Sequence, residues 1–478
     1  MKVEDIRYAL SYGDVLLVPM KSSIDSRKKV DVSTRLTKGI KLNLPLVSAN
    51  MDTVTEANMA IAMATLGGIG IIHRFMDIES EANEVRKVKR AQSYIIDKPY
   101  CIRPDETVEE ARYEMAKRGV MSLLVVDKSF KLLGILTDRD IRFVKDDKTK
   151  VSKAMTPRAR LIVGTPGMND EEALKILDKH RLEKLPLVDR NNVVRGLITS
   201  KDIYKMIHSE NSAKDRRGRL LVGAAIGVKG DYMERAAKLA EAETDLLVLD
   251  IAHGHSASVI NALKNIKKVI SDVPIIAGNV ATKEGTEDLI AAGADGVKVG
   301  IGPGAACITR TVTGAGMPQL TAVIECHEAS KAHGIEIIAD GGIKASGDIT
   351  KALAAGACSV MIGSIFAGTD ESPGYFTIRD GVKHKSYRGM ASFGANVSRK
   401  RIDKREVDPQ DIFDIVPEGV ESSVVYKGSM KEVVNQLIGG LRSGMSYCGA
   451  ANLEELRKNA KFVRLTNSGL SESYEKLS

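Results

Sequence analysis

The chain has 478 residues, which exceeds one ordinary domain and suits one large domain with a smaller one. Its hydrophobic content of 43% is enough to build buried cores, and its net charge is +8. The basic residues alternate with acidic ones, which favours a solvated surface over a nucleic-acid-binding face. The single dense basic run, Ser398–Arg401, is followed by acidic residues and is interpreted as a mobile loop.

The cysteines exclude two classes of small domain. Five are present, an odd number, and none forms a CxxC pair, so neither a disulfide framework nor a zinc site is expected. The charged start has no apolar core of the signal-peptide type, and no run of 18 apolar residues could span a membrane. We therefore expect a soluble, cytoplasmic protein with no membrane or nucleic-acid partner.

A repeat with a period of 62 residues lies in the first half of the chain. Three separate blocks share this offset: Glu109–Ala111 with Glu171–Ala173, Leu123–Asp127 with Leu185–Asp189, and Gly134–Asp140 with Gly196–Asp202. Each copy predicts a helix, a strand, a turn, a second strand and a helix opened by Thr-x-x-Asp. The repeat therefore predicts two similar modules, at residues 93–150 and 151–212.

These modules resemble a tandem pair of cystathionine-β-synthase-type (CBS-type) domains, which often bind adenine or guanine nucleotides between the copies. The resemblance implies that Asp140 and Asp202 hold the ribose hydroxyls of such a nucleotide. The alternative is that both aspartates only cap helices. The sequence leaves both interpretations open.

The remainder of the chain alternates short apolar runs with amphipathic stretches, a pattern typical of a parallel sheet. Eight such runs are present: 45–48, 70–72, 221–225, 246–250, 274–279, 297–301, 337–340 and 360–363. Eight units predict an α/β fold, a closed (β/α)8 (TIM) barrel formed by residues 1–92 and 213–478, with the module pair inserted after the second strand. A doubly wound open sheet is the alternative, but no GxGxxG opening supports it.

In such barrels the chemistry lies at the carboxyl ends of the strands. Glycine-rich turns follow the seventh and eighth predicted strands, at Asp340–Gly342 and Gly363–Ser364. Backbone N–H groups in such turns can approach an anion, which favours a phosphate site there.

The clearest nucleophile is Cys307, in the loop Gly300–Arg310 after the sixth strand. A thiol surrounded by backbone N–H groups can act as a thiolate. Cys326 and Cys358 fall within helix or strand patterns and are expected to be buried, and Cys448 is expected to be structural.

Together these residues resemble the IMP dehydrogenase / GMP reductase superfamily. The likeness extends from Tyr12 to Ser443 and rests on four motifs: Ser48–Thr53, the Gly300–Arg310 loop, Asp340–Gly342 and Ala367–Ser372. It implies a purine nucleoside monophosphate (GMP or IMP) as substrate, a nicotinamide cofactor, and a homotetramer or octamer.

Carried over to this sequence, the resemblance implies that Cys307 attacks C2 of the purine, with Thr309 and Glu418 as the other catalytic residues. It implies a substrate site formed by Met51, Asn279, Gly304, Asp340, Gly342, Gly363, Ser364, Tyr387, Gly389 and Met390. It implies a cofactor site formed by Asp250, Ala252, His253, Gly300 and Gly302. It also implies a monovalent cation such as K+ near Gly302, Gly304 and Cys307. Ala305 is a departure, because many members have a serine there.

The two activities of the superfamily share a covalent intermediate on the cysteine and differ in how they resolve it. A dehydrogenase must hydrolyse the intermediate, with water activated by an arginine–tyrosine pair on a flap, here at about residues 388–428. No tyrosine lies between Met390 and Pro417; Arg399, Arg401 and Arg405 are present, and Glu406 stands where tyrosine is expected. This favours GMP reductase activity with NADPH.

Two alternatives stay open. One is an IMP dehydrogenase that uses NAD+ and has an atypical flap. The inserted modules and the Ser386–Met390 sequence motif favour it. The other is a nucleotide-sensing regulatory protein without turnover, against which Cys307, Thr309 and Glu418 argue.

Overall fold

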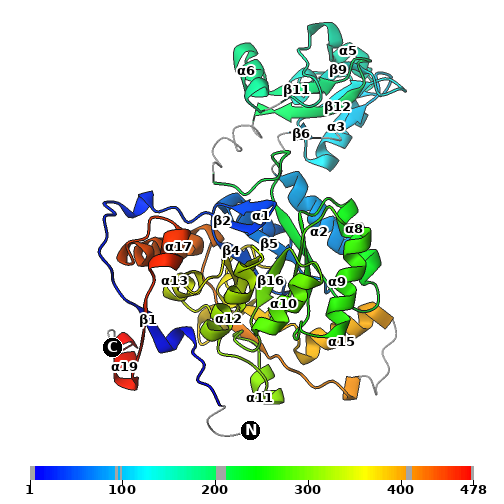
Figure 1. Ribbon diagram of the computed structural model, residues 1–478. Coiled ribbons are helices and arrows are strands. Elements are labelled where there is room, and N and C mark those ends of the chain that lie inside the picture. Colours follow the sequence, from blue (N-terminus) through cyan, green and yellow to red (C-terminus); the bar gives the residue numbers. More distant parts are fainter. Residues whose placement is uncertain are drawn as a thin grey trace. The chain divides into compact units, whose positions relative to one another are not determined.

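The computed structural model describes residues 6–91, 95–96, 99–168, 170–200, 211–404 and 412–474. The chain divides into two compact units (Figure 1). The barrel unit comprises Met1–Ala91 and Asn211–Ser478, and the inserted unit comprises Gln92–Glu210. Within the described residues, no helix combines the length and the apolar character that crossing a membrane requires.

The barrel unit is built around eight parallel strands that close on themselves in the order β13-β14-β15-β16-β17-β18-β4-β5. The strands are β4 (Leu46–Ser48), β5 (Ile69–Ile72), β13 (Val222–Ile226), β14 (Leu246–Asp250), β15 (Ile275–Val280), β16 (Gly296–Val299), β17 (Glu336–Asp340) and β18 (Ser359–Ile362). Each lies on one of the eight predicted apolar runs, so the predicted (β/α)8 barrel is confirmed. Nearly all their residues are buried, as expected for strands covered on both faces.

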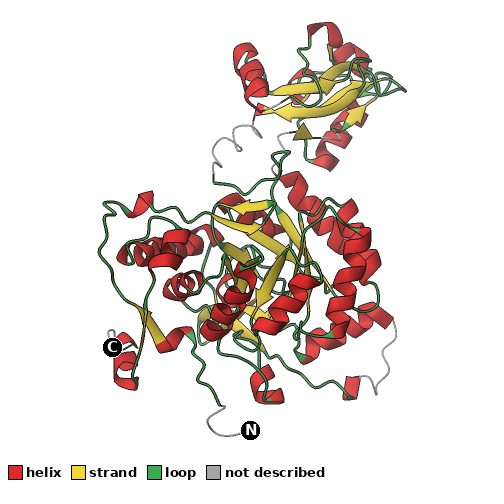
Figure 2. Ribbon diagram, in the orientation of Figure 1, coloured by secondary structure: helices red, strands yellow, loops and turns green. Residues whose placement is uncertain are grey.

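Helices surround these strands, as Figure 2 shows. They are α1 (Ala57–Leu66), α2 (Ile78–Ala91), α8 (Tyr232–Glu241), α9 (Ala257–Val269), α10 (Lys283–Ala291), α12 (Gln319–Lys331), α13 (Ser346–Ala354) and α14 (Ser364–Ala367), whereas α11 (Thr309–Thr313) lies in the loop after β16 and projects beyond the barrel (Figure 1). Further elements of the unit are β1 (Val15–Leu17), β2 (Thr34–Thr37), β3 (Ile40–Leu42), α17 (Met430–Tyr447), α18 (Leu453–Asn459), β22 (Phe462–Arg464) and α19 (Asn467–Tyr474).

The chain leaves the barrel after α2 and returns at Asn211, and both points are anchored at the amino-terminal ends of the strands. Lys89 of α2 is 5% exposed and forms ion pairs with Asp215, at 3.1 Å, and with Asp245, which precedes β14. Asn43 donates a hydrogen bond of 2.9 Å to the carbonyl of Asn211. The departing and returning segments are therefore held together by the barrel unit itself.

The inserted unit contains a four-stranded sheet, β10-β9-β8-β7, and a three-stranded sheet, β11-β12-β6. Its elements are β6 (Ile95–Ile96), β7 (Cys101–Ile102), α3 (Val108–Arg118), β8 (Ser122–Val126), β9 (Leu132–Thr137), α4 (Asp138–Ile141), α5 (Val151–Ala154), β10 (Thr156–Pro157), α6 (Asp170–His180), β11 (Lys184–Val188) and β12 (Val194–Thr199). The succession α3-β8-β9 thus recurs as α6-β11-β12.

The two copies contact each other through equivalent residues. The N–H of Leu132 donates to the carbonyl of Asn192 at 2.9 Å, and the N–H of Val194 donates to the carbonyl of Phe130 at 3.0 Å. Phe130 and Asn192, which are 62 residues apart, both have a positive φ, of 59° and 61°. The sequence repeat therefore has a two-fold counterpart in the backbone.

A third region of the barrel unit covers the carboxyl ends of the strands. Its described elements include an antiparallel sheet, β19-β20-β21, and the helix α15: β19 (Phe376–Arg379), β20 (Val382–Arg388), α15 (Phe393–Lys404) and β21 (Glu421–Val425). The prediction of a loop at Ser398–Arg401 is wrong, because these residues belong to α15. The Ser392 hydroxyl accepts from the N–H of Ala395, and Glu421 accepts from the N–H of Gly394, so the first turn is capped.

Candidate active site

A cavity of about 400 Å³ opens at the carboxyl ends of the barrel strands. This volume is within the range typical of pockets for small molecules and cofactors. Residues within or shortly after every barrel strand except β13 line it, and residues of the segments Tyr387–Arg399 and Glu418–Gly419 close one side. The cavity is therefore where the fold predicts a site, although its residues come from segments far apart in sequence.

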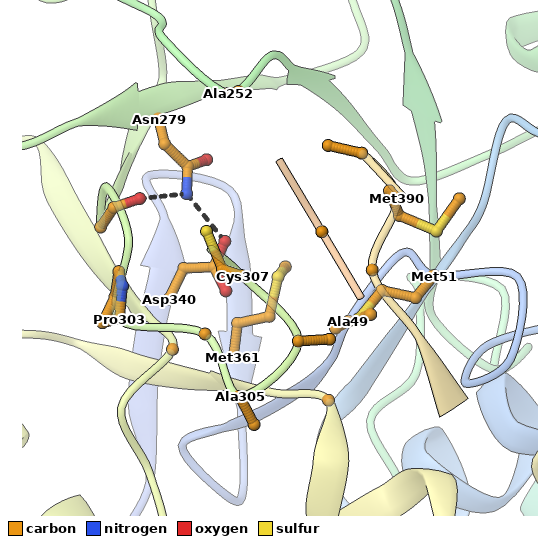
Figure 3. Close-up of a pocket in the computed structure, with 18 of the residues that line it drawn as sticks. Ala49, Met51, Ala252, Asn279, Pro303, Ala305, Cys307, Asp340, Met361 and Met390 are labelled. Atoms are coloured by element: carbon orange, nitrogen blue, oxygen red, sulfur yellow. Dashed lines mark hydrogen bonds between the residues drawn. The ribbon is translucent and has the colours of Figure 1, made fainter. Parts of the chain in front are cut away.

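Cys307 lies in the loop after β16 and faces this cavity (Figure 3). Its thiol donates a hydrogen bond of 3.2 Å to the hydroxyl of Thr309, which in turn donates to the carboxylate of Glu418 at 2.8 Å. The loop is fixed on the covering region, because the N–H of Ile308 donates to the carbonyl of Glu418 at 2.9 Å. A continuous proton path therefore runs from the thiol to a carboxylate.

The other thiols are unsuited to this chemistry. Cys326 and Cys358 have no exposed surface, and burial raises the pKa of each to about 12. Burial also raises the pKa of Cys448 and of Cys101. The burial of Cys326, Cys358 and Cys448 agrees with the prediction for these three residues, and of the described cysteines only Cys307 lines the cavity.

A buried lysine joins two sides of the cavity. Lys298, on β16, is 2% exposed and forms ion pairs with Asp250 at the end of β14 and with Asp340 at the end of β17, the latter at 2.7 Å. It also donates to Asn279, whose amide donates to Asp340 at 2.9 Å (dashed in Figure 3). Burial alone would lower the pKa of Lys298, but the two carboxylates outweigh it and raise the pKa.

The turn after β17 packs tightly against the cysteine loop. Gly341 and Gly342 have φ values of 88° and 81°, in the left-handed region that favours glycine. A Cβ at Gly341 would lie 3.1 Å from the backbone nitrogen of Gly304. The side chain of Tyr387 is 6% exposed, and its hydroxyl would lie 3.1 Å from a Cβ at Gly363. Burial, with the nearby Asp340 and Cys307, raises the pKa of Tyr387, so the phenol stays a neutral donor.

Comparison with known proteins agrees with this geometry. The family model described as "IMP dehydrogenase / GMP reductase domain" matches residues 9–475. The chain belongs to this family. It is 50% identical to the inosine-5'-monophosphate dehydrogenase of Nitrosopumilus maritimus, over 98% of both chains, and 51% identical to that of Bacillus subtilis, over 97% of this chain and 95% of the other.

This chain is also similar to solved structures of a GMP reductase. A cysteine-to-alanine variant of the Trypanosoma brucei enzyme, in complex with guanosine 5'-monophosphate, superimposes with a TM-score of 0.92 and 47% identity, covering 99% of both chains. The same enzyme in complex with guanosine 5'-triphosphate gives a TM-score of 0.81 and 43% identity, covering 97% of this chain and 99% of the other.

The structure brings together nearly all the residues that the family resemblance implied. The cavity is lined by Met51, Asp250, Ala252, Asn279, Gly300, Gly302, Gly304, Ala305, Cys307, Thr309, Asp340, Gly342, Gly363, Ser364, Tyr387, Gly389, Met390 and Glu418. His253 is outside this lining; it is exposed, and its ring packs edge-on against His255. The implied cation near Gly302, Gly304 and Cys307 stays a prediction.

Two predicted residues belong to the inserted unit. Asp140 Oδ2 accepts hydrogen bonds from the N–H of Thr137 at 2.8 Å and from its hydroxyl at 2.7 Å, closing a capping box on α4. Asp202 lies outside the described residues, as do Arg405 and Glu406.

The lining residues that sequence reasoning missed include Lys298, Arg74 and Phe75. Lys298 had a signal, because a lysine within an apolar barrel strand must find buried partners. Arg74 and Phe75 directly follow His73 after β5, at a strand end where this fold places functional residues.

Proposed function

We propose that this chain is a GMP reductase that converts GMP and NADPH into IMP, ammonia and NADP+. The proposal is carried by the flap, where no tyrosine stands between Met390 and Pro417 to help activate water. Loss of a positioned general base typically costs two to four decades of rate. Reduction needs no hydrolytic water, so this absence does not impair it.

The thiol–hydroxyl–carboxylate path supports covalent chemistry at Cys307. As the sulfur bonds to C2 of GMP, its proton passes through Thr309 to Glu418. The same path returns a proton to the departing amine, which leaves as ammonia. A bound nicotinamide cofactor supplies the hydride that C2 receives. The C–S bond then breaks, which releases IMP and leaves Cys307 as a thiolate; uptake of one proton restores the thiol with which the cycle began.

The lining fits both ligands. Gly342, Gly363, Ser364 and Tyr387 offer donors for the 5'-phosphate, and Asp340 offers a carboxylate for ribose hydroxyls. Beyond them, the Asp250 carboxylate suits a second ribose, and Ala252 and Phe75 give apolar surface for a flat ring. Asp250, Ala252, Gly300 and Gly302 would hold the nicotinamide end.

The competing function, IMP dehydrogenase, is favoured by the names of relatives at about 50% identity. Turnover decides between them. With GMP and NADPH we expect sustained production of IMP and ammonia. With IMP and NAD+ we expect one burst of NADH, about one per active site, because the intermediate is trapped. Sustained XMP production at about 1 per second or faster would overturn the proposal.

We also infer that the inserted unit is a pair of CBS-type modules that binds purine nucleotides, with Asp140 and Asp202 near the ribose. Its internal two-fold symmetry supports this, and a guanosine triphosphate complex is known for the Trypanosoma brucei relative. ATP or GTP should then change the activity of the full chain and leave a barrel lacking Gln92–Glu210 unaffected. A nucleotide effect that persists in the shortened chain would contradict this.

A further inference from the structure

An ion pair joins the barrel to the region that covers it. Nε and Nη2 of Arg388, the last residue of β20, both donate to Oδ2 of Asp52 in the loop after β4, and the bond from Nε is 2.8 Å. The N–H of Arg388 also donates to the hydroxyl of Thr53 at 3.3 Å. The side chains of Asp52 and Arg388 are 10% and 28% exposed, so solvent screens the pair only in part. Two segments that are far apart in sequence are therefore held together beside the cavity.

The loop after β4 is fixed by its own hydrogen bonds. The hydroxyl of Thr55 donates to the carbonyl of Ala49 at 2.7 Å. The N–H groups of Val54 and Thr55 donate to the carbonyl of Met51, at 2.9 and 3.0 Å. Val54 and Thr55 have no exposed surface. This turn is therefore a rigid support, to which Arg388 attaches the covering region.

On the covering side, Arg388 lies beside the carboxylate that caps α15. A Cβ at Gly394 would lie 3.3 Å from Nη1 of Arg388 and 3.3 Å from the carboxylate carbon of Glu421. Arg388 and Glu421 also face each other in the register of β20 and β21. The guanidinium group therefore lies between the loop after β4 and the first turn of α15.

These contacts bring two methionines together. The N–H of Asp52 donates to Sδ of Met390 at 3.4 Å, and Met51 directly precedes Asp52. Both methionines line the cavity, and Figure 3 shows them on the same side of it. Because thioether side chains are flexible, the place of this apolar surface depends on the backbone segments that carry it. The ion pair holds those two segments in register.

One oxygen of Asp52 indicates that the pair does more than stabilise the fold. Oδ1 is buried and has no hydrogen-bond partner among the described residues. A buried acceptor without a partner is destabilising, and a largely buried ion pair adds little net stability. The position that the pair imposes explains it better than the stability that it adds.

We propose that Arg388 is a positioning residue, which acts through Asp52 to hold Met390 beside Met51 as the surface that the purine base contacts. Neither Arg388 nor Asp52 lines the cavity. Tyr387, which precedes Arg388, is held separately by its burial and by its pairing with Ser422 of β21. The inference rests on the proposed function only in taking a purine nucleoside monophosphate as the ligand, so it applies to GMP and to IMP.

The test compares two ligands that share a ribose phosphate and differ in the base. The affinity of the full chain for GMP is measured by calorimetry, and its affinity for ribose 5-phosphate by displacement of GMP. Arg388→Gln should weaken GMP binding about tenfold, as expected when an apolar contact surface is misplaced. The affinity for ribose 5-phosphate should stay within about twofold, and IMP should behave as GMP does.

Arg35→Gln is the matched control. Nε and Nη2 of Arg35 both donate to Oε1 of Glu336, at 3.0 and 2.8 Å, so this variant removes the same kind of ion pair from the amino end of β17. Neither residue lines the cavity. Both ligand affinities should stay within about twofold of those of the unaltered protein. A loss of GMP affinity as large as that of Arg388→Gln would overturn the proposal.

The pattern of affinities decides the remaining cases. GMP affinity that is unchanged in Arg388→Gln, or that falls no further than the affinity for ribose 5-phosphate, would overturn the proposal. Asp52→Asn should weaken GMP binding in the same way, and the double variant should bind GMP no more weakly than the weaker single variant, because both changes remove one contact. Additive losses would show that Arg388 does not act through Asp52.

If these variants fail to fold, the unaltered protein provides the test. The amides of Asp52 and Arg388 donate to side chains on the opposite segment. Their hydrogen exchange should be slowed more by saturating GMP than by saturating ribose 5-phosphate. Equal protection by the two ligands would count against the proposal. Because these measurements need no turnover, a chain that proves to be a dehydrogenase fails the proposed function without affecting their result.

Discussion

The barrel unit and the inserted unit both place aspartates at or just after strand ends, and use them differently. In the barrel unit, Asp250 and Asp340 end β14 and β17, line the cavity and share the buried cation of Lys298. In the inserted unit, Asp140 follows β9 and one of its oxygens is occupied by the N–H and hydroxyl of Thr137. An aspartate at or near the end of a strand thus lines a shared cavity in the barrel unit and caps a helix locally in the inserted unit.

This difference shows that an aspartate after a strand indicates a site only when a second feature accompanies it. In the barrel unit that feature is a cavity with a buried counter-ion, which several strands must supply together. In the inserted unit the cap is complete within four residues. Substitutions should therefore have long-range effects in the first unit and local effects in the second.

The largest effect is expected at Cys307. Cys307→Ala should lower turnover by at least three decades, because no other described cysteine lines the cavity. Iodoacetamide should label Cys307 first in the unaltered protein, since the pKa values of Cys326 and Cys358 are raised to about 12. Turnover above about a tenth of the original rate in this variant would contradict covalent catalysis.

The second-largest effect is expected at Lys298, whose positive charge Asp250 and Asp340 share. Lys298→Met keeps the length of the side chain but leaves Asp250 and Asp340 facing each other without a counter-ion. We expect the free energy of unfolding to fall by about 3–5 kcal/mol, as when one partner of a buried ion pair is removed. Calorimetric affinities for GMP and for the dinucleotide should both fall.

A structural control separates these two consequences. Thr244→Ala removes a buried hydroxyl near the other end of β14, where it donates to the carbonyl of Val222 at 3.1 Å. It should destabilise the barrel by about 1 kcal/mol while leaving both ligand affinities unchanged. If Lys298→Met also leaves both affinities unchanged, the lysine is only a structural ion-pair partner.

A smaller effect is expected from removing the inserted unit. A chain in which a short linker replaces Gln92–Glu210 should retain barrel turnover within about tenfold, because the barrel closes without this segment. The measurement is kcat with GMP and NADPH, in the absence of regulatory nucleotides. An inactive but folded product would show that the inserted unit is part of the active site.

The smallest effect should come from Asp140→Ala. Loss of the cap should reduce the local stability of α4 by about 1 kcal/mol, detectable as faster amide hydrogen exchange in Asp138–Ile141. Turnover without added nucleotide should not change. A large fall in basal turnover would show that Asp140, like Asp250 and Asp340, acts beyond its own turn of helix.

The sequence was sufficient to predict those features of the fold and the site that depend on repeated or local patterns. Eight apolar runs predicted the barrel, and the glycine-flanked Cys307 predicted the loop that faces the cavity. Lys298 could not be assigned a role, because its partners Asp250 and Asp340 lie on strands far from it in sequence. The pairing exists only once the barrel is closed.

The helix α15 was missed for a different reason. The sequence of α15 is rich in basic residues and has no clear apolar periodicity. Its first turn is capped by a hydrogen bond from the N–H of Gly394 to Glu421, which lies on β21, later in the chain. Arg399 therefore could not be placed beside Phe75 from the sequence. Tertiary contacts, rather than intrinsic propensity, decide such segments.

The ion pairs of Lys89 with Asp215 and Asp245 have a consequence for how this architecture could change. They fasten together the two ends of the interruption on the barrel's own surface, so the barrel does not depend on the intervening residues to keep those ends adjacent. These two chain ends therefore form a fixed insertion point. A module whose first and last residues lie close together could be inserted there in place of Gln92–Glu210. Exchange of one inserted module for another, with the barrel left intact, is the evolutionary route that these ion pairs open.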